Sequence, residues 1–451
     1  MSIEAPDQRA PRLKLLRDAL ERGTLRRVQR MVNALHPAEI ADLLESLPPA
    51  ERDVVWDLVD TQTDGDVLVA LNEEVRAKLV GGMDAEELIA ATDGMDLDDL
   101  ADLVPDLPEA VTRQVIQSMD HQDRERLRAV MAYAEDTAGG LMDPDVVTVR
   151  PDVTLEVVLR YLRIRGELPA GGDALYVVNR YGRYVGYLYL TSLLTSDPTM
   201  TVAELMDASV EGVPATIDAR EVASLFETRD LVTAPVVDSD GRLLGRITID
   251  DVVDVIREEA EHSILSMAGL AEDEDMFAPV VTSSRRRAVW LGVNLATAFI
   301  AASVVGLFQA TIDQVVALAV LMPIVASMGG IAGSQTLTLI IRGVALGQVD
   351  GSNARWLMMR ELAVGVLNGL GWALVVAAAT ILWFKSWLLG GIIALALIIN
   401  LVIAALSGVL IPLVLRRMKI DPALAGSVVL TTVTDVVGFM VFLGLGALLL
   451  T

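Results

Sequence analysis

The stretch from Ala423 to Leu450 constrains this chain most, because it is too long and too apolar for an ordinary core helix. Its length suits a tilted membrane span, which needs about 20 apolar residues. One carboxylate, Asp435, lies near its middle. An ionised Asp at the centre of a bilayer is costly and persists where it faces water or a cation. The stretch therefore predicts an ion path at Asp435. A packing Asp, bonded to a neighbour such as Thr431, Thr432 or Thr434, is the alternative.

Four further apolar segments precede this one, and together they predict a five-helix all-α transmembrane domain. The expected spans are 288–307, 315–341, 361–382, 387–414 and 423–450. Basic residues flank the spans mostly on one side: Arg285, Arg286, Arg287, Arg342, Arg355, Arg360, Arg416, Arg417 and Lys419, against Lys385 on the other. Basic loops stay in the cytoplasm. We therefore expect a multi-pass membrane protein with a cytoplasmic N-terminus and an outer C-terminus; the family resemblance described below implies that the membrane is a bacterial inner membrane.

The second span contains Pro323 and then the run Ser327–Gln335, in which three glycines and two serines are concentrated. Small residues permit close helix packing. An unwound turn that offers carbonyls to an ion is the other option, since irregular backbone is tolerated at this depth where it lines water. Beside Asp435 we favour pore lining. Glu361 opens the third span, where it can cap the helix or snorkel, or take part in the pore.

The negative charge of the chain is confined to its first part. All but five of the 61 acidic residues lie before Arg285, and the formal net charge is −25. Such a surface repels nucleic acid and attracts cations. The chain has no cysteine, which excludes thiolate metal sites. It contains neither a phosphate-binding G-x-x-x-x-G-K-[ST] run nor H-E-x-x-H, so we expect no catalytic residues and no enzyme.

Residues 1–134 carry a repeat that predicts an α-helical solenoid. Cap or turn residues recur every twelve positions, at His36, Pro48, Asp60, Asn72, Asp84, Asp96, Pro108 and Asp120. Each opens a short run with apolar residues at helical spacing, and Asp, Asn and Pro are common at helix starts. Short helices that bury their faces only against neighbours form such a superhelix.

Two copies of a strand–turn–strand–helix unit follow, over 135–200 and 201–262. The strands are expected at 174–178, 184–189, 234–237 and 243–249, where β-branched and aromatic residues dominate. The copies resemble a tandem pair of α+β CBS domains, which bind adenosine nucleotides or metal. That resemblance makes ATP a candidate ligand, with Thr248 and Asp251 at the ribose. A strand end capped by Asp251 is the simpler reading. An acidic and basic connecting helix is expected over 263–287.

The order of these parts resembles the MgtE family of magnesium channels. The matching motifs are Glu135–Met142, the glycine run of the second span, Asp421–Leu424 and Thr434–Gly438. The resemblance implies a homodimer in the lipid bilayer in which Asp435 binds hydrated Mg²⁺. Pore ligands are then expected among Asp435, Gly329, Gly330, Ser334, Thr431 and Thr434. Regulatory Mg²⁺ is expected at Asp218, Asp230, Asp251, Asp254, Glu259 and Asp421.

The chain departs from the family pattern at several positions. Ile331 stands where the glycine segment usually has Asn, and Leu231 replaces an aromatic residue that could stack adenine. Arg220, His262 and Ser263 stand where a related sensor has acids. These changes predict altered permeability among divalent cations, a higher Mg²⁺ requirement for gating and a poorer ATP site.

The sequence as a whole predicts a Mg²⁺-selective, Mg²⁺-gated channel or transporter whose cytosolic domains sense Mg²⁺. Oxygen ligands suit Mg²⁺, and the expected spans contain no Cys or His. Two alternatives remain. One is a divalent cation transporter coupled to Na⁺ or H⁺, and the other is a non-conducting membrane metal sensor.

Overall fold

The computed structural model describes residues 16, 18, 25–93, 95–166, 168–169, 171–270, 275–345, 348–349 and 353–450. The polar start, Met1 to Arg12, lies outside them. The chain folds into two compact units. The first holds Met1–Ala260 and Asp273–Ala278, and the second holds Glu261–Glu272 and Pro279–Thr451. The chain therefore passes between the units three times.

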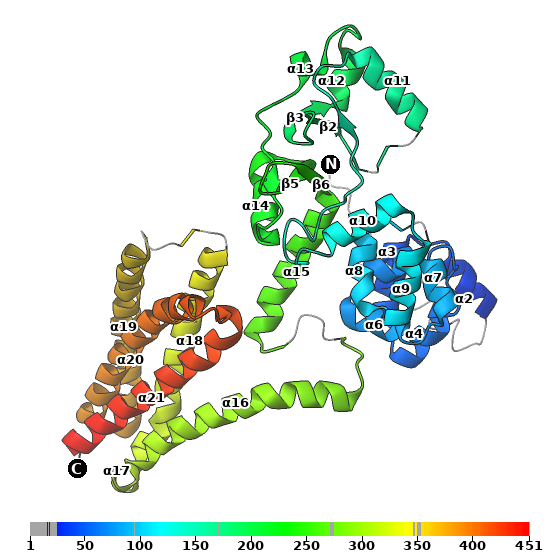
Figure 1. Cartoon of the computed structure of the whole chain (residues 1–451). Coiled ribbons are helices and arrows are strands. Elements are labelled where there is room, and N and C mark those ends of the chain that lie inside the picture. Colours follow the sequence, from blue (N-terminus) through cyan, green and yellow to red (C-terminus); the bar gives the residue numbers. More distant parts are fainter. Residues whose placement is uncertain are drawn as a thin grey trace. The chain divides into compact units, whose positions relative to one another are not determined.

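Short helices form the N-terminal part of the first unit (Figure 1). They are α2 (Leu25–Val32), α3 (Pro37–Glu45), α4 (Pro49–Trp56), α5 (Asp64–Ala70), α6 (Glu73–Val80), α7 (Ala85–Ala91), α8 (Leu97–Leu103), the 3₁₀ turn η1 (Val104–Asp106), α9 (Glu109–Ser118) and α10 (His121–Val130). The expected solenoid of short helices is confirmed. Seven of the eight repeat positions are N-caps, and α5 is the exception because it begins after Thr63 instead of Asp60.

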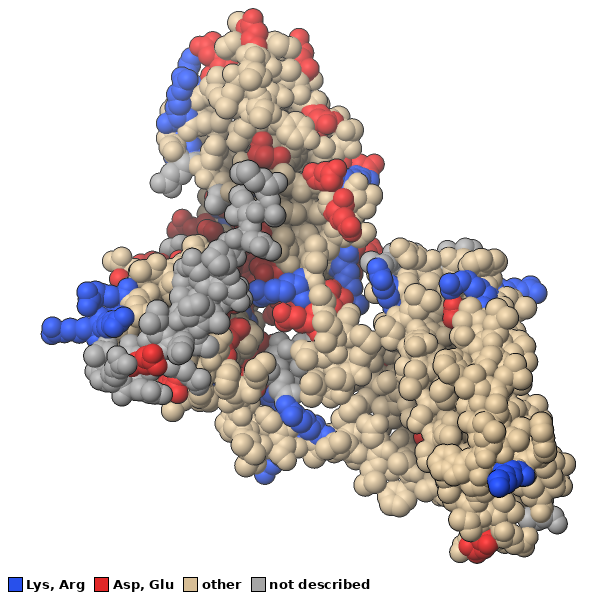
Figure 2. Space-filling model, turned by 180° about the vertical axis from the view of Figure 1, so that it is seen from behind, with Lys and Arg blue, Asp and Glu red and all other residues tan. Residues whose placement is uncertain are grey.

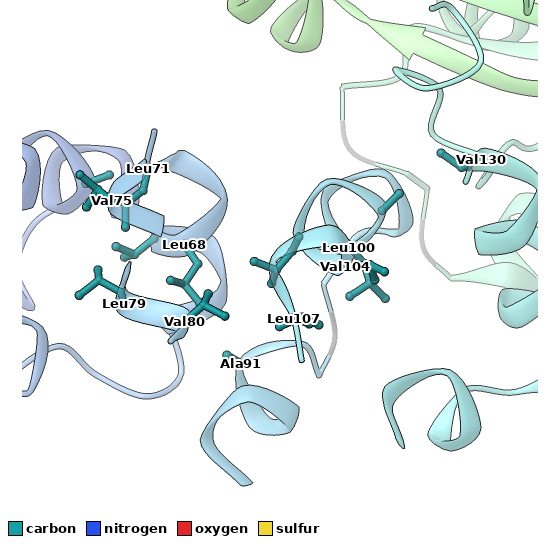
Figure 3. Close-up of a cluster of buried hydrophobic side chains, with 14 of the residues drawn as sticks. Leu68, Leu71, Val75, Leu79, Val80, Ala91, Leu100, Val104, Leu107 and Val130 are labelled. Atoms are coloured by element: carbon teal, nitrogen blue, oxygen red, sulfur yellow. The ribbon is translucent and has the colours of Figure 1, made fainter. Parts of the chain in front are cut away.

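Side-chain caps explain where these helices begin. The Asp84 carboxylate accepts hydrogen bonds from the backbone N–H groups of Glu86 and Glu87, both at 2.9 Å. Glu87 accepts in return from the Asp84 N–H at 2.8 Å. Losing such a cap costs about 1 kcal/mol. Each helix is too short to be stable alone, so the apolar faces pack into a shared core that includes Leu68, Leu100 and the other residues of Figure 3.

A buried ion pair fixes a later segment to this helical domain. The Arg52 guanidinium, 1% exposed, donates to both carboxylate oxygens of Asp275 at 2.9 and 3.1 Å. It also donates to the carbonyls of Leu44 and Leu47. Burial alone would raise the pKa of Asp275, but hydrogen bonds from Arg52, the Phe277 N–H and Lys78 lower it. We call this contact the Arg52–Asp275 clasp. It holds the chain just before Val280, where the first membrane helix begins.

The two β-units of the first unit have the same topology, which confirms the CBS-like pair. The first sheet has the order β1 (Thr148–Val149), β2 (Ala174–Val178), β3 (Tyr184–Tyr189). The second has the order β4 (Val213–Pro214), β5 (Thr233–Val237), β6 (Leu243–Thr248). In each, the first pair is parallel, the second is antiparallel, and the register shifts between the last two residues of the middle strand.

Helices surround these sheets. They are α11 (Leu155–Arg165), α12 (Leu190–Thr195), α13 (Val202–Leu205), α14 (Ala219–Arg229) and α15 (Ile249–Met267). The two-residue strands β1 and β4 were not expected, because they are too short to show alternation. They pair in parallel with the middle strands and so close each sheet. Acidic side chains are scattered over the face of this first unit that Figure 2 shows.

The second unit contains five helices long and apolar enough to cross a membrane. They are α16 (Val280–Gly306), α18 (Val316–Ala345), α19 (Ala354–Phe384), α20 (Trp387–Arg417) and α21 (Pro422–Leu450). The short α17 (Gln309–Gln314) joins the first two. Figure 2 shows Lys and Arg gathered mainly at one end of a largely uncharged bundle. The five expected spans are confirmed, each slightly longer than expected or shifted at its start.

The single connecting helix expected over 263–287 is wrong. Residues 263–267 are the last turn of α15, and residues 280–287 open α16. The helix ends where Gly269 takes a φ of +73°, a left-handed conformation that favours glycine. A Cβ at Gly269 would also lie 2.0 Å from the Trp290 ring. The acidic residues Glu272, Asp273 and Glu274 of this stretch lie outside the described residues.

The glycine run of the second span is helical. Helix α18 is continuous from Val316 to Ala345 and passes through Pro323 and Gly329. The expectation of an unwound turn that offers carbonyls is therefore wrong, because helical carbonyls are already bonded within the helix. Close helix packing explains why glycine is required at two positions of this run. A Cβ at Gly329 would lie 2.3 Å from the Asn400 side chain on α20, and one at Gly333 would lie 2.8 Å from Leu430 on α21.

Candidate functional site

A groove with a volume of about 800 Å³ runs between α18 and α21 in the second unit. Its lining is mixed, with one carboxylate, several hydroxyls, one amide and small apolar groups. The lining residues are Ala326, Ser327, Gly330, Ile331, Ser334, Gln335, Thr338, Thr431 and Asp435. Eight of the nine are uncharged, so Asp435 supplies the groove's only formal charge.

Asp435 is half-buried and makes no ion pair or hydrogen bond with any residue that the structure describes. The neighbouring hydroxyls are committed elsewhere on α21. Thr431 donates to the Ser427 carbonyl at 2.9 Å, Thr432 to Val428 at 2.7 Å, and Thr434 to the Thr431 carbonyl at 3.1 Å. The packing alternative for Asp435, a bond to one of these threonines, is therefore wrong. A carboxylate at this depth without a partner is suited to hold a cation.

The structure brings four of the six expected pore residues to the groove: Gly330, Ser334, Thr431 and Asp435. Gly329 and Thr434 do not line it. Both are buried on the opposite faces of their helices, and Gly329 packs on Asn400. Gly329 faces α20 because its backbone packs on Asn400, whereas its neighbour Gly330 points into the groove.

Ala326 and Thr338 line the groove outside the run expected from the sequence, and Ser327 and Gln335 line it at the two ends of that run without having been named as single ligands. The spacing held a signal, since positions 327, 331, 334 and 338 recur at the helical interval and mark one stripe of α18. Ile331, which stands where the family usually has Asn, lies in the same stripe. Ile331 is 59% exposed and lines the groove, so its apolar side chain lies among the hydroxyl, amide and carboxylate groups of the lining.

Glu361 lies away from the groove. It is 4% exposed within α19, where it accepts a hydrogen bond from Thr336 of α18 at 3.2 Å and one from Arg360 at 2.6 Å. The expectations of a helix cap, a snorkelling side chain or a pore ligand are not met. Glu361 instead connects α19 to the buried face of α18.

The expected regulatory acids occupy varied environments in the first unit. Asp218 caps α14 by accepting from the Arg220 N–H at 2.9 Å, and Asp230 ends the same helix at a φ of +50°. Asp254 is exposed. Glu259 forms an ion pair with Arg220, one of the positions where a related sensor has an acid. These four acids are thus caps, solvated groups or members of an ion pair.

Thr248 and Asp251, the expected ribose contacts, bind each other. The Asp251 carboxylate accepts from the Thr248 N–H at 3.1 Å and from its hydroxyl at 2.9 Å. Asp251 therefore caps the end of strand β6, which was the alternative to a ribose contact expected from the sequence. Burial raises the pKa of Asp251 to about 6, although the bonds from Thr248 lower it.

Asp421 lies in the second unit at the start of α21. Its Oδ1 accepts from the Ala423 N–H at 2.8 Å and so caps the helix. Its Oδ2 lies 3.2 Å from Nε2 of His262, at the end of α15, and the pair becomes ionic when the ring is protonated. The helix that carries Asp435 is thereby in direct contact with the last turns of α15.

A second group of acids on α8 was missed. Burial raises the pKa of Asp98 to about 7, and repulsion from Asp143 and Asp251 adds to the shift. Burial likewise raises the pKa of Asp99 to about 7 and of Asp102 to about 6. No group of three or more acids or histidines among the described residues is arranged as a ready metal site. The dense run of Asp in 96–102 was the available signal.

Comparisons with known proteins agree with this architecture. A family model described as a divalent cation transporter matches residues 322–445. The MgtE intracellular N domain matches 35–136, and the CBS domain matches 138–198 and 202–258. The magnesium transporter MgtE of Thermus thermophilus is 32% identical over 445 residues, 96% of this chain and 98% of its own length. That of Bacillus subtilis is 28% identical over 96% of this chain and 95% of its own.

Among solved structures, the chain is similar to the cytosolic domain of the Mg²⁺ channel MgtE in complex with ATP. The identity is 35%, the TM-score is 0.48, and the match covers 53% of this chain and 98% of that one. The near full-length match to the Thermus thermophilus relative, together with the N domain, the CBS pair and the transporter segment, decides the family. This chain belongs to the MgtE family of divalent cation transporters.

Proposed function

We propose that this protein carries Mg²⁺ across a bacterial inner membrane along the groove between α18 and α21, with Asp435 as the main cation ligand. The observation that carries the proposal is the unpartnered Asp435 carboxylate, surrounded by hydroxyl and amide oxygens. Mg²⁺ prefers oxygen ligands, keeps most of its waters and is usually held by one or two carboxylates. A groove of about 800 Å³ leaves room for a hydrated ion.

The transporting form is a homodimer in this proposal. A single carboxylate on one wall of an open groove is an incomplete cation path, and a second copy facing it would supply a second Asp435 and close the path. The N-terminus lies in the cytoplasm and the C-terminus outside. The basic residues gathered at one end of the membrane helices support this orientation.

Transport is regulated by Mg²⁺ bound to the acidic first unit. The support comes from the crowded acids of α8 and from Asp251, whose raised pKa values reflect unfavourable ionisation in the absence of a counter-ion. A divalent cation would relieve that repulsion and favour the compact arrangement. Asp218, Asp230, Asp254, Glu259 and Asp421 remain further candidate ligands. ATP stays a candidate ligand of the CBS pair through Thr248 and Asp251.

The test is ion flux into liposomes that contain the purified protein, with Mg²⁺ varied on each side. Asp435→Asn keeps the size of the side chain and removes its charge, so Mg²⁺ flux should be abolished while the folded dimer persists. Asp313→Asn is the matched control, since Asp313 lies in α17 outside the groove.

Three results would count against the proposal or favour one of its alternatives. Undiminished Mg²⁺ flux through folded Asp435→Asn would show that the Asp435 carboxylate is not part of the transport path. Flux that requires a Na⁺ or H⁺ gradient would favour a coupled transporter instead of a channel, and absence of any flux from the unchanged chain would favour a metal sensor.

A further inference from the structure

Several polar side chains on the groove wall of α18 make no hydrogen bond with any residue that the structure describes. They line the groove and are Ser327, Ser334, Gln335 and Thr338. Thr336 of the same helix does not line the groove, and its hydroxyl donates to Glu361 at 3.2 Å. A polar group that faces hydrocarbon without a partner is costly. The free groups are therefore suited to a groove that contains water.

Close contacts between α18 and α21 show how far along the groove each group lies. Three contacts set the register: Gly446 with Leu318, Gly333 with Leu430, and Gly426 with Leu337. Residue numbers rise along one helix as they fall along the other, so the two helices are antiparallel. Asp435 follows Leu430 by five residues. It is therefore level with the residue five before Gly333, next to Ser327.

The free groups of α18 fall into two layers. Ser327 shares the level of Asp435. The second layer, which we call the neutral layer, lies further toward Ala345 and consists of Ser334, Gln335 and Thr338. At a rise of 1.5 Å per residue, its backbone centre is about 10 Å from that of Asp435 along the helix axis. Ile331 lies between the two layers, so an apolar side chain separates the charged part of the groove from the neutral part.

The neutral layer has the chemistry to hold a hydrated cation by its waters. Ser334 and Thr338 are four residues apart and so share one face of the helix, next to Gln335. Their hydroxyl and amide oxygens can accept hydrogen bonds from water. Mg²⁺ keeps several of its waters when it binds to protein. Without a carboxylate the layer binds the ion weakly, and a conducting path requires sites from which an ion can leave.

We propose that Ser334, Gln335 and Thr338 form a second station for hydrated Mg²⁺ in the groove, separate from Asp435. In the proposed orientation the station lies on the cytoplasmic side of Asp435. This inference rests on the proposed transport through the groove. It requires no direct bond between these side chains and the metal ion.

The experiment measures whether Mg²⁺ protects a thiol placed in the neutral layer. The full chain has no cysteine, so Thr338→Cys introduces a single thiol beside Ser334 and Gln335. The reagent is a charged, water-soluble methanethiosulfonate, applied to the full-length protein in detergent micelles. At about ten times the half-protecting concentration, MgCl₂ should slow labelling about tenfold, because about a tenth of the sites stay free. NaCl at matched ionic strength should not protect the thiol.

Two backgrounds separate the station from the known carboxylate. In Asp435→Asn the protection by Mg²⁺ should persist. Gln335→Met keeps the length of the side chain without its amide and should raise the half-protecting Mg²⁺ concentration about fivefold, the effect of one hydrogen bond. Gln314→Met is the matched control, because Gln314 lies in α17 outside the groove. Ser334→Cys is the second reporter and decides the question if Thr338→Cys does not fold.

Three labelling results would overturn the proposal. A thiol that does not react would show that the layer is closed to water. Loss of protection in folded Asp435→Asn would show that Asp435 holds the only ion in the groove. Equal protection in Gln335→Met and Gln314→Met would show that Mg²⁺ protects the thiol from elsewhere, for instance by acting on the acidic first unit.

Flux in liposomes tests whether the station lies on the transport path. Maximal Mg²⁺ flux should fall about fivefold in Gln335→Met and stay unchanged in Gln314→Met. Undiminished flux in Gln335→Met would overturn the proposal, since the bound ion would then lie off the path. The labelling assay does not depend on transport. If the unchanged chain carried no Mg²⁺, the proposed function would fail while the protection still reported whether the neutral layer binds the ion.

Discussion

Removing the carboxylate of the Arg52–Asp275 clasp should release the segment that precedes α16. Asp275→Ala leaves a guanidinium that is 1% exposed without its counter-charge. Breaking a buried pair from one side typically costs 3–5 kcal/mol. The carbonyls of Leu44 and Leu47 still accept from Arg52, so we expect the lower end, about 3 kcal/mol. That value raises the population with the segment undocked about a hundredfold.

Hydrogen exchange at the backbone amide of residue 275 is the direct measurement, because this N–H donates to the Glu74 carboxylate of α6 at 3.0 Å and the substitution leaves that bond in place. Its protection should fall about a hundredfold in Asp275→Ala. The control is Glu109→Ala, which breaks the exposed Arg113–Glu109 pair and should cost no more than about 0.5 kcal/mol. Equal protection of the amide of residue 275 in Asp275→Ala and the unchanged protein would refute the reasoning. So would an equal effect of Glu109→Ala on the unfolding of the first unit.

Three further predictions follow from the groove and from the acidic unit. Ile331→Asn should change the Mg²⁺/Mn²⁺ flux ratio, because it replaces an apolar group in the groove by an amide; an unaltered ratio and total flux would show that the side chain does not face the path. Asp98 has a raised pKa of about 7, so it stabilises the fold below about pH 4 and this contribution is lost as pH rises through about 7. In thermal unfolding without Mg²⁺, Asp98→Asn should therefore gain about 2 kcal/mol at pH 8, after discounting for partial exposure, and little at pH 4, and equal shifts at both would contradict it. Mg²⁺ should protect the chain near Arg257 from protease, whereas NaCl at matched ionic strength should not; equal cleavage under both would eliminate bridging by a divalent ion.

The fold was largely predictable because its signals are local. A twelve-residue recurrence of caps marks the helices of residues 35–134, and alternation marks strands such as β2 and β6. The membrane helices follow from length and hydropathy alone. The break after Met267 was missed, because the turn at Gly269 depends on a tertiary contact with Trp290.

The site was predictable only in part, since a sequence shows which residues are polar but not which way a helix is turned. Asp435 stands out in the sequence because an ionised carboxylate in the middle of a membrane span is energetically costly. Which glycine of the run faces the groove depends on the helices that pack against α18, such as α20, where Gly329 lies against Asn400 about 70 positions away in the sequence. The same holds for Glu361, whose partner Thr336 cannot be found from spacing.

The interleaved course of the chain has a consequence for its integrity. A break between Leu270 and Asp275 would leave residues 261–270, which belong to the second unit, on the N-terminal fragment. The C-terminal fragment would keep Asp275–Ala278, which Arg52 fixes in the first unit. Each fragment would thus contain a segment that completes the fold of the other. The two pieces of a nicked chain are therefore expected to purify together as one particle, and the same division offers a natural place to express the protein as two complementing halves.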